Sequence, residues 1–191
     1  MGRRYDQQTG QLQIGCFIDE DGYPIFRAAI SNITPAATPT DIFQLVPGAT
    51  KTVRVRRYKI TGFAGTAGQM PYRAERRSTA NTGTKEVAFT VAKLDSGDPA
   101  STVTSVSYYS SAAGNPTATG AVVAVLDAGR LGFPSVTVPQ PGPVYEEMTE
   151  AQNKNFTFRG VLDIFAITLT GAAVPTTGVY DLMVEWKEDA S

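Results

Sequence analysis

The clearest alternation of apolar and polar positions lies near the end of the chain. Tyr180, Leu182, Val184 and Trp186 occupy one set of alternate positions, and mostly charged residues occupy the other set. A period of two is the pattern of a β-strand that buries one face. The sequence therefore predicts a half-buried strand over residues 178–187.

More strand candidates follow one another every ten or so residues from Asp41 onward. They are 42–46, 52–61, 70–77, 86–94, 103–109, 121–126, 131–138 and 156–170. The sequences between them, such as PG, NTG, SGDP and AGNP, are rich in turn-forming residues. Short strands at this spacing predict an all-β sandwich or barrel. Only residues 144–155 have the character of a short helix.

Residues 156–170 differ from the other candidates because their second half is apolar on both faces. Ile164, Phe165, Ile167 and Leu169 fall on both sides of an extended chain. A strand with this composition is expected to be covered on both sides, in the centre of a sandwich or under a subunit interface.

The first forty residues have a different character. Two short apolar runs, at 16–18 and 25–30, flank the turn sequence DEDGYP, and the stretch NITPAATPTD follows. Pro35 and Pro39 disfavour a helix there and favour extended backbone. We therefore predict an extended N-terminal arm over 1–40 and a β-sandwich domain over 41–191.

The strand candidate TKTVRVRRYKITG at 50–62 breaks strict alternation. Val53 and Val55 share one face, but Tyr58 and Ile60 fall on the other unless one residue is added between them. A β-bulge at Arg56–Arg57 adds that residue. The four apolar side chains then point inward and the cations point outward.

Three interpretations of these cations remain open. Eight of the 17 Lys and Arg residues lie between Lys51 and Arg77, and eight of the 18 acidic residues lie from Glu146 onward. The favoured interpretation is the solvated face of a bulged strand. Complementary contact between like subunits, or with an acidic protein surface, is the second. Direct nucleic-acid binding is the least favoured, because the pI is near 5.5.

Composition removes several kinds of chemistry. The chain has no histidine, which excludes Ser-His-Asp and Cys-His catalysis and His-ligated zinc. Its one cysteine, Cys16, cannot form an intrachain disulfide. No apolar stretch approaches the length of a membrane span, and the first residues lack the apolar core of a secretory signal. We expect no cofactor, no membrane contact and synthesis in a cytoplasm.

Three small clusters carry weak chemical hypotheses. The sequence DEDG at 19–22 has the acids of a calcium loop without their spacing. Asp95 and Asp98 could act as an acid–base pair, but DSGDP is an ordinary turn sequence. Tyr108 and Tyr109 could stack on a sugar, although a packed pair of strand residues is favoured. None of these predicts an enzyme.

Several longer segments are similar to known sequences. The run ISNITPAATPTDIFQLVPGATKTVRVRRYKITG, followed by RRSTANTGT, LDSGDPAST, FRGVLDIFAITLTGAAVP and YDLMVEWKE, resembles small tailed-bacteriophage virion proteins of the capsid decoration, or cement, type. The resemblance covers about Ile30 to Glu188. It implies a jelly-roll-like β-sandwich on the outer shell of a virion, bound to the major capsid protein and bridging its subunits. It supplies no catalytic residues.

From this resemblance we expect synthesis in the bacterial host cytoplasm, residence on the capsid surface and a homo-oligomer, with a trimer as the simplest choice. The residues expected to contact the partner are Phe17, Ile25 and Phe26 on the arm, and Arg54, Arg56, Arg57, Arg73, Arg76 and Arg77. Two other functions stay open. One is a tail, collar or head-fibre component, and the other is a carbohydrate-binding β-sandwich module.

Overall fold

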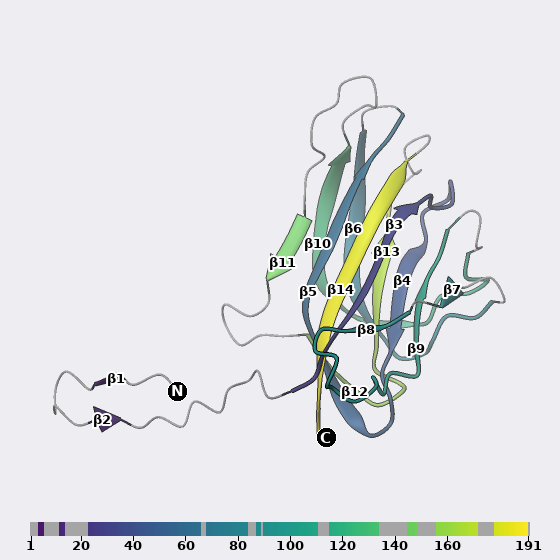
Figure 1. The fold of residues 1–191 in the computed structure, drawn as a ribbon. Helices are drawn as coiled ribbons and strands as arrows, with labels where there is room; N and C mark the ends of the chain where they lie inside the picture. Colours follow the sequence, from purple (N-terminus) through teal and green to yellow (C-terminus); the bar gives the residue numbers. More distant parts are fainter. Residues whose placement is uncertain are drawn as a thin grey trace.

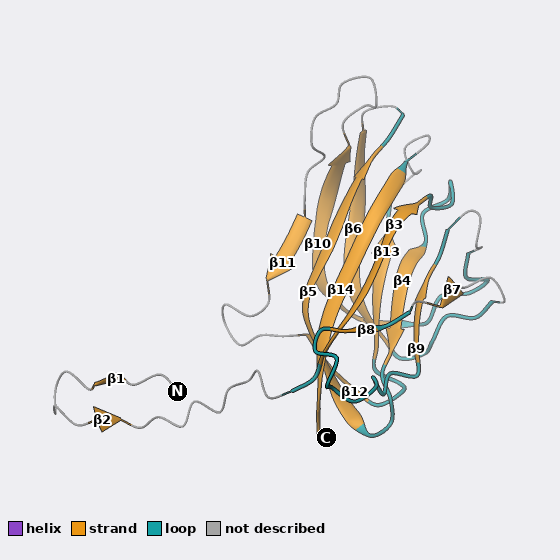
Figure 2. Ribbon diagram, in the orientation of Figure 1, coloured by secondary structure: helices purple, strands orange, loops and turns teal. Residues whose placement is uncertain are grey.

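The chain folds as two antiparallel β-sheets packed face to face (Figure 1). This computed structural model describes residues 4–5, 12–13, 23–65, 68–83, 87–88, 90–110, 115–133, 145–148, 156–171 and 178–190. The described residues form strands and loops and no helix (Figure 2). The prediction of an all-β sandwich is confirmed.

The first sheet has the order β11-β5-β14-β3-β8, and β12 pairs with β5 as well. Its strands are β3 (Ile25–Ile33), β5 (Lys51–Phe63), β8 (Ala92–Lys93), β11 (Tyr145–Met148), β12 (Phe156–Arg159) and β14 (Val179–Ala190). The predicted C-terminal strand is its centre, since β14 pairs along its length with both β5 and β3.

The second sheet has the order β10-β6-β13-β4-β9-β7. Its strands are β4 (Asp41–Val46), β6 (Gly68–Arg77), β7 (Val87–Ala88), β9 (Ser105–Tyr108), β10 (Val122–Phe133) and β13 (Ile164–Leu169). A separate pair, β1 (Arg4–Tyr5) and β2 (Leu12–Gln13), precedes both sheets. The strands β7, β8 and β9 all lie in the insertion between β6 and β10, which spans 78–121.

The bulge predicted in β5 is confirmed. The pairing of β5 with β14 shifts by one residue between Arg57, opposite Glu185, and Val55, opposite Trp186. The extra residue is Arg56, and it brings Val53, Val55, Tyr58 and Ile60 onto the buried face, each with no exposed surface. Burial of these four side chains therefore selects the bulge over a regular strand.

Aromatic rings fill the space between the sheets. The Phe165 ring of β13 lies 5.5 Å from Phe158 and 6.2 Å from Tyr58, centroid to centroid. The Phe26 ring of β3 lies 6.0 Å from Trp186. Since aromatic side chains bury the largest apolar areas, this layer is the main source of hydrophobic stabilisation.

A polar tie also joins the sheets inside the core. Asp127 of β10 accepts hydrogen bonds from the Tyr58 hydroxyl of the first sheet and, at 3.4 Å, from the Tyr72 hydroxyl of the second. Gly129 makes room for this arrangement, because a Cβ there would lie 2.7 Å from the Tyr72 hydroxyl oxygen.

The N-terminal boundary differs from the prediction. Residues 25–33 form β3, which pairs with β14 from Ile25 to Ile33. Phe26, Ala28 and Ile33 are buried in the core. The sandwich therefore includes part of the predicted arm. The short apolar run was the visible signal, but its strand partner lies more than 140 residues away in the sequence.

Five predicted elements are wrong in their extent or type. Residues 121–126 and 131–138 were separate candidates, yet β10 runs unbroken from Val122 to Phe133. Residues 86–94 divide into β7 and β8 of different sheets, and 156–170 divide into β12 and β13 around a turn. The predicted helix at 144–155 contains β11 instead, because the edge of β5 offers backbone partners there.

Candidate functional site

The outer face of the first sheet carries a ladder of ion pairs. Arg54 of β5 lies 2.6 Å from Asp189, measured from Nε to Oδ2. One oxygen of Glu185, Oε2, accepts from Arg27 of β3 at 2.7 Å and from Arg57 of β5 at 3.2 Å. The basic residues of β5 thus face the acidic residues of β14 within one chain. At these positions, the basic and acidic groups that the sequence places far apart form ion pairs within one chain.

An open depression of about 410 Å³ lies on the same face, beyond the ion pairs. Lys59, Asp181 and Met183 are among its lining residues. Asp181 accepts a hydrogen bond of 2.9 Å from the backbone N–H of Asn32, which has a positive φ of 60°. The carboxylate therefore stabilises a bulge in β3 opposite β14.

The three arginines of β6 have three different environments. Arg73 is half exposed, and its guanidinium lies 4.0 Å from Glu75. Arg76 lies between the sheets, 2.9 Å from Asp163 and with its guanidinium 5.3 Å from the centre of the Phe158 ring. Arg77 is buried. The six arginines predicted as contacts are therefore divided between the two sheets and do not form one continuous basic patch.

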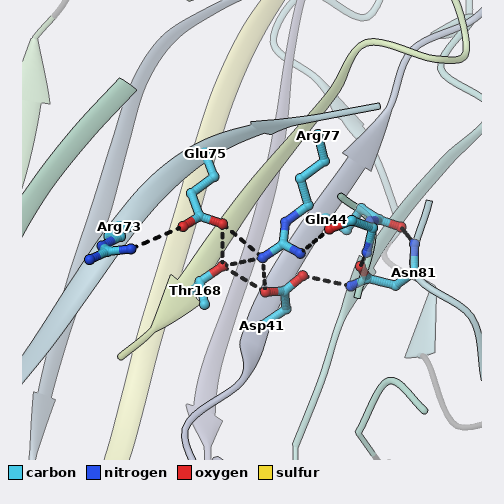
Figure 3. A network of polar contacts seen from close by, with 8 residues as sticks. Asp41, Gln44, Arg73, Glu75, Arg77, Asn81 and Thr168 are labelled. Atoms are coloured by element: carbon cyan, nitrogen blue, oxygen red, sulfur yellow. Dashed lines mark hydrogen bonds and ion pairs between the residues drawn. The ribbon is translucent and has the colours of Figure 1, made fainter. Parts of the chain in front are cut away.

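Arg77 is the centre of a buried polar network on the outer face of the second sheet (Figure 3). Its Nη2 atom lies 2.7 Å from Asp41 Oδ1, 2.8 Å from Glu75 Oε2 and 2.9 Å from Thr168 Oγ1. Thr168 in turn lies 2.6 Å from Asp41 Oδ1. The side chains of Arg77, Asp41 and Glu75 are at most 3% exposed.

Two loop segments of the insertion close over this network. Asn81 donates to Asp41 Oδ2 at 2.8 Å, and its backbone N–H donates to Gln44 Oε1 at 3.2 Å. Arg77 Nη1 donates to the carbonyl oxygen of Gly120 at 2.7 Å. The network therefore fixes segments 78–83 and 115–121 on the outer face of the sheet. It also explains the burial of β13 on both faces, which the sequence predicted.

Burial dominates the electrostatics of Asp41. Desolvation raises the pKa of this carboxyl, and the Arg77 guanidinium and the hydrogen bonds from Thr168 and Asn81 oppose that shift. The neighbouring Glu75 carboxylate raises the pKa further. The net result is a pKa of Asp41 above its ordinary value, with burial as the largest cause.

The remaining predicted residues have mixed outcomes. Phe26 is 1% exposed and packs in the core, so its side chain is not available to a partner in this fold. Ile25 lies next to it, half buried, at the start of β3. Phe17 and the acidic turn at 19–22 lie outside the described residues. Tyr109 is 2% exposed, which removes it as a platform for a sugar ring.

The sequence DSGDP is a turn, as its composition predicted. Asp95 Oδ1 accepts from the backbone N–H of Gly97 at 2.8 Å, and Lys93 donates to the carbonyl oxygens of Ser96 and Asp98. Within the described ranges, no cluster of three or more potential metal ligands occurs, and no helix is long and apolar enough to cross a membrane.

Sequence reasoning missed a group of exposed apolar side chains. Of the eight large apolar residues that are exposed in the described part of the chain, Val122, Val123 and Val125 belong to β10, and Val161 and Leu162 belong to the turn before β13. The signal was present as AVVAVL at 121–126, an apolar run without alternation. The run was predicted as a strand, and its exposure was not predicted.

Comparisons with protein-family models, with curated proteins and with solved structures each gave no match to this chain.

Proposed function

We propose that this chain is a structural protein of a bacteriophage particle, and that it binds the outer shell as a decoration protein. It acts by binding rather than by turnover. The major capsid protein is the proposed partner, and a homotrimer at positions of local threefold symmetry is the proposed assembly. Contacts to several shell subunits at once would give strong overall attachment from modest individual contacts.

The strand order is the observation that carries this proposal. The strands β11 and β12, both paired with β5, count as one position. Among the strands β3, β4, β5, β6, β10, β11/β12, β13 and β14, taken in chain order, each then lies in the other sheet from the one before it, except β10, which pairs with the preceding β6 in the second sheet. The two sheets have the orders β3-β14-β5-β11/β12 and β4-β13-β6-β10. We propose that this is the connectivity of a jelly roll, a fold found in viral capsid domains and also in lectins and cupins. The sequence resemblance over residues 30–188 favours the viral choice.

The test is the copy number of the chain in purified particles of the virus that encodes it. Quantitative mass spectrometry would compare its peptides with those of the major capsid protein. A number near one copy per shell subunit, or a simple fraction of it, is expected for a decoration protein. A few copies per particle would place the chain in the tail, collar or head fibre, and absence from the particle would reject the proposal.

The predicted contacts have a separate test. Arg54→Glu with Arg56→Glu reverses the charge of the outer face of β5. The control is Arg130→Glu, at an exposed position of β10 in the other sheet. If β5 contacts the shell, the double variant should bind particles that lack the protein at least tenfold more weakly than the control, since opposite charges across an interface become like charges. Equal binding would remove β5 from the contact.

A further inference from the structure

Two loop segments cover the buried network around Arg77 without an apolar anchor. Residues 78–83 read STANTG and residues 115–121 read NPTATGA, and together they are here called the lid. Neither segment contains a large aliphatic or aromatic side chain, and the alanines of both segments are exposed. The hydrophobic effect, which holds the strands of the sandwich together, therefore contributes little to holding the lid on the sheet.

The two segments of the lid are bonded to each other. Backbone N–H groups donate across the lid to carbonyl oxygens at 2.8 to 3.0 Å, from Ser78 to Ala121, from Thr82 to Ala118 and from Thr117 to Thr82. The segments also approach closely, because Gly120 leaves no room for a Cβ against the carbonyl group of Thr79. These contacts make the lid one unit, so we expect its two segments to move together.

The contacts between the lid and the sheet are polar. Among the described residues, three hydrogen bonds join them. Asn81 donates from its side chain to Asp41 and from its backbone to Gln44, and Arg77 Nη1 donates to the carbonyl oxygen of Gly120. Water can replace the partner in each of these bonds, so the net stabilisation that each one gives to the closed arrangement is small.

The side chains beneath the lid are polar as well, and closure removes them from water. Arg77, Asp41 and Glu75 form the buried ion pairs, and removal of charges from water costs free energy even when the charges are paired. Gln44 is 2% exposed, and its Nε2 atom has no acceptor among the described residues. Such a donor is unfavourable in the closed arrangement. When the lid opens, water reaches these groups, which offsets part of the lost contacts.

We propose that the lid opens as a unit while the two sheets stay folded. Opening uncovers the three groups of the sheet to which the lid is bound, Nη1 of Arg77, Oδ2 of Asp41 and the side-chain amide of Gln44. Local opening is expected of segments that have few buried apolar contacts. The alternative is a lid that separates only when the whole sandwich unfolds. This proposal stands independently of the proposed role in a virion.

Hydrogen exchange of the full chain, followed by NMR at several low urea concentrations, tests the proposal. The amides of Ser78, Thr82 and Thr117 should share similar protection factors, at least about a hundredfold below those of β14, which is paired on both sides. Protection of the lid should hardly depend on urea, because local opening exposes little surface, whereas protection of β14 should fall. Equal protection and equal urea dependence in the lid and in β14 would overturn the proposal.

Asn81→Ala tests whether contacts with the sheet control the opening. The change removes the bond to Asp41 and one bond within the lid, from the Gly120 N–H, but leaves the backbone bonds of Thr82 and Thr117 intact. The protection factors of Thr82 and Thr117 should nevertheless fall about tenfold or more, since the lid opens more often.

The control is Thr119→Ala, at an exposed position of the same lid, which should leave both protection factors unchanged. If the loss of protection in Asn81→Ala is confined to positions 81 and 120, the lid residues open one by one and the proposal is wrong. An equal effect of Thr119→Ala would also reject it, because the contacts with the sheet would then not control the opening.

Discussion

Arg77 of β6 and Asp41 of β4 contact each other across the width of β13, with Nη2 and Oδ1 2.7 Å apart and both side chains buried. Thr168 of β13 lies beneath the pair and bonds to both. The contact joins three strands that are distant in the sequence. It also holds the first and last turns of the 78–121 insertion, through Asn81 and Gly120.

Arg77→Met should destabilise the protein by about 3–5 kcal/mol, because it leaves Asp41 and Glu75 buried without a counter-ion. Urea unfolding followed by circular dichroism measures this free energy. The matched control is Arg159→Met at the exposed last residue of β12, which should change stability by less than about 0.5 kcal/mol. A loss below about 1 kcal/mol for Arg77→Met would show that the network stabilises little.

The triple variant Arg77→Met, Asp41→Asn, Glu75→Gln should be more stable than Arg77→Met alone. Its neutral side chains no longer leave buried charges without partners, although some hydrogen bonds are lost. The comparison uses the same urea titration. Equal losses in the two variants would assign the cost to packing around the missing guanidinium rather than to uncompensated carboxylates.

Asp41 should make stability depend on pH in the direction opposite to most acidic residues. Burial raises its folded pKa above the ordinary 3.8, so between these two values the folded chain binds more protons than the unfolded chain. Its contribution is fully present below the ordinary value and is lost as pH rises through the folded pKa. Asp41→Asn should therefore gain stability relative to wild type as pH rises from about 4, by at most about 1.4 kcal/mol per pH unit.

Urea unfolding of both proteins between pH 4 and 8 measures this difference, with Asp98→Asn as the control in the 94–98 turn. The control should keep a nearly constant difference from wild type. A difference for Asp41→Asn that falls as pH rises would mean that Arg77 and the hydrogen bonds outweigh desolvation, and the assigned direction of the pKa shift would then be wrong.

Glu185→Gln should remove the charge that holds both Arg27 and Arg57 on the outer face of the first sheet. The arginines are 36% and 27% exposed, so solvent screens both pairs, and the expected loss is about 1 kcal/mol. The loss should shrink in 1 M salt, because exposed ion pairs are screened. Denaturant unfolding at low and high salt measures both quantities, and a salt-independent loss would contradict the electrostatic cause.

Phe26→Ala tests whether β3 belongs to the core. The ring is 1% exposed and packs against Trp186, so its loss should cost about 3–5 kcal/mol. Phe63→Ala is the matched control, because that ring is 44% exposed at the end of β5 and its loss should cost under about 1 kcal/mol. Thermal unfolding with tryptophan fluorescence compares the two. Similar small losses would return residues 25–33 to a peripheral arm.

Local patterns in the sequence were sufficient where one face of a strand is buried. The alternation at 180–186 and the interrupted alternation at 53–60 identified β14, β5 and the bulge at Arg56. These features can be predicted from the sequence because the side chains that share a buried strand face lie close together along the chain. At 121–126 the sequence predicted a strand but not its exposure, because an apolar run on an exposed edge has the same composition as a buried strand.

The sequence by itself determined the fold class, the inner face of β5 and the double-sided burial of β13, because each follows from the polarity of neighbouring residues. Only the tertiary structure decided which charges are used within the chain. Arg54 and Arg57 meet Asp189 and Glu185 more than 125 residues later, and Arg77 meets Asp41 across an intervening strand. An arginine in a sequence has the same charge whether solvent, a partner or a buried carboxylate faces it. Strand order, which depends on long-range pairing, decides among these three.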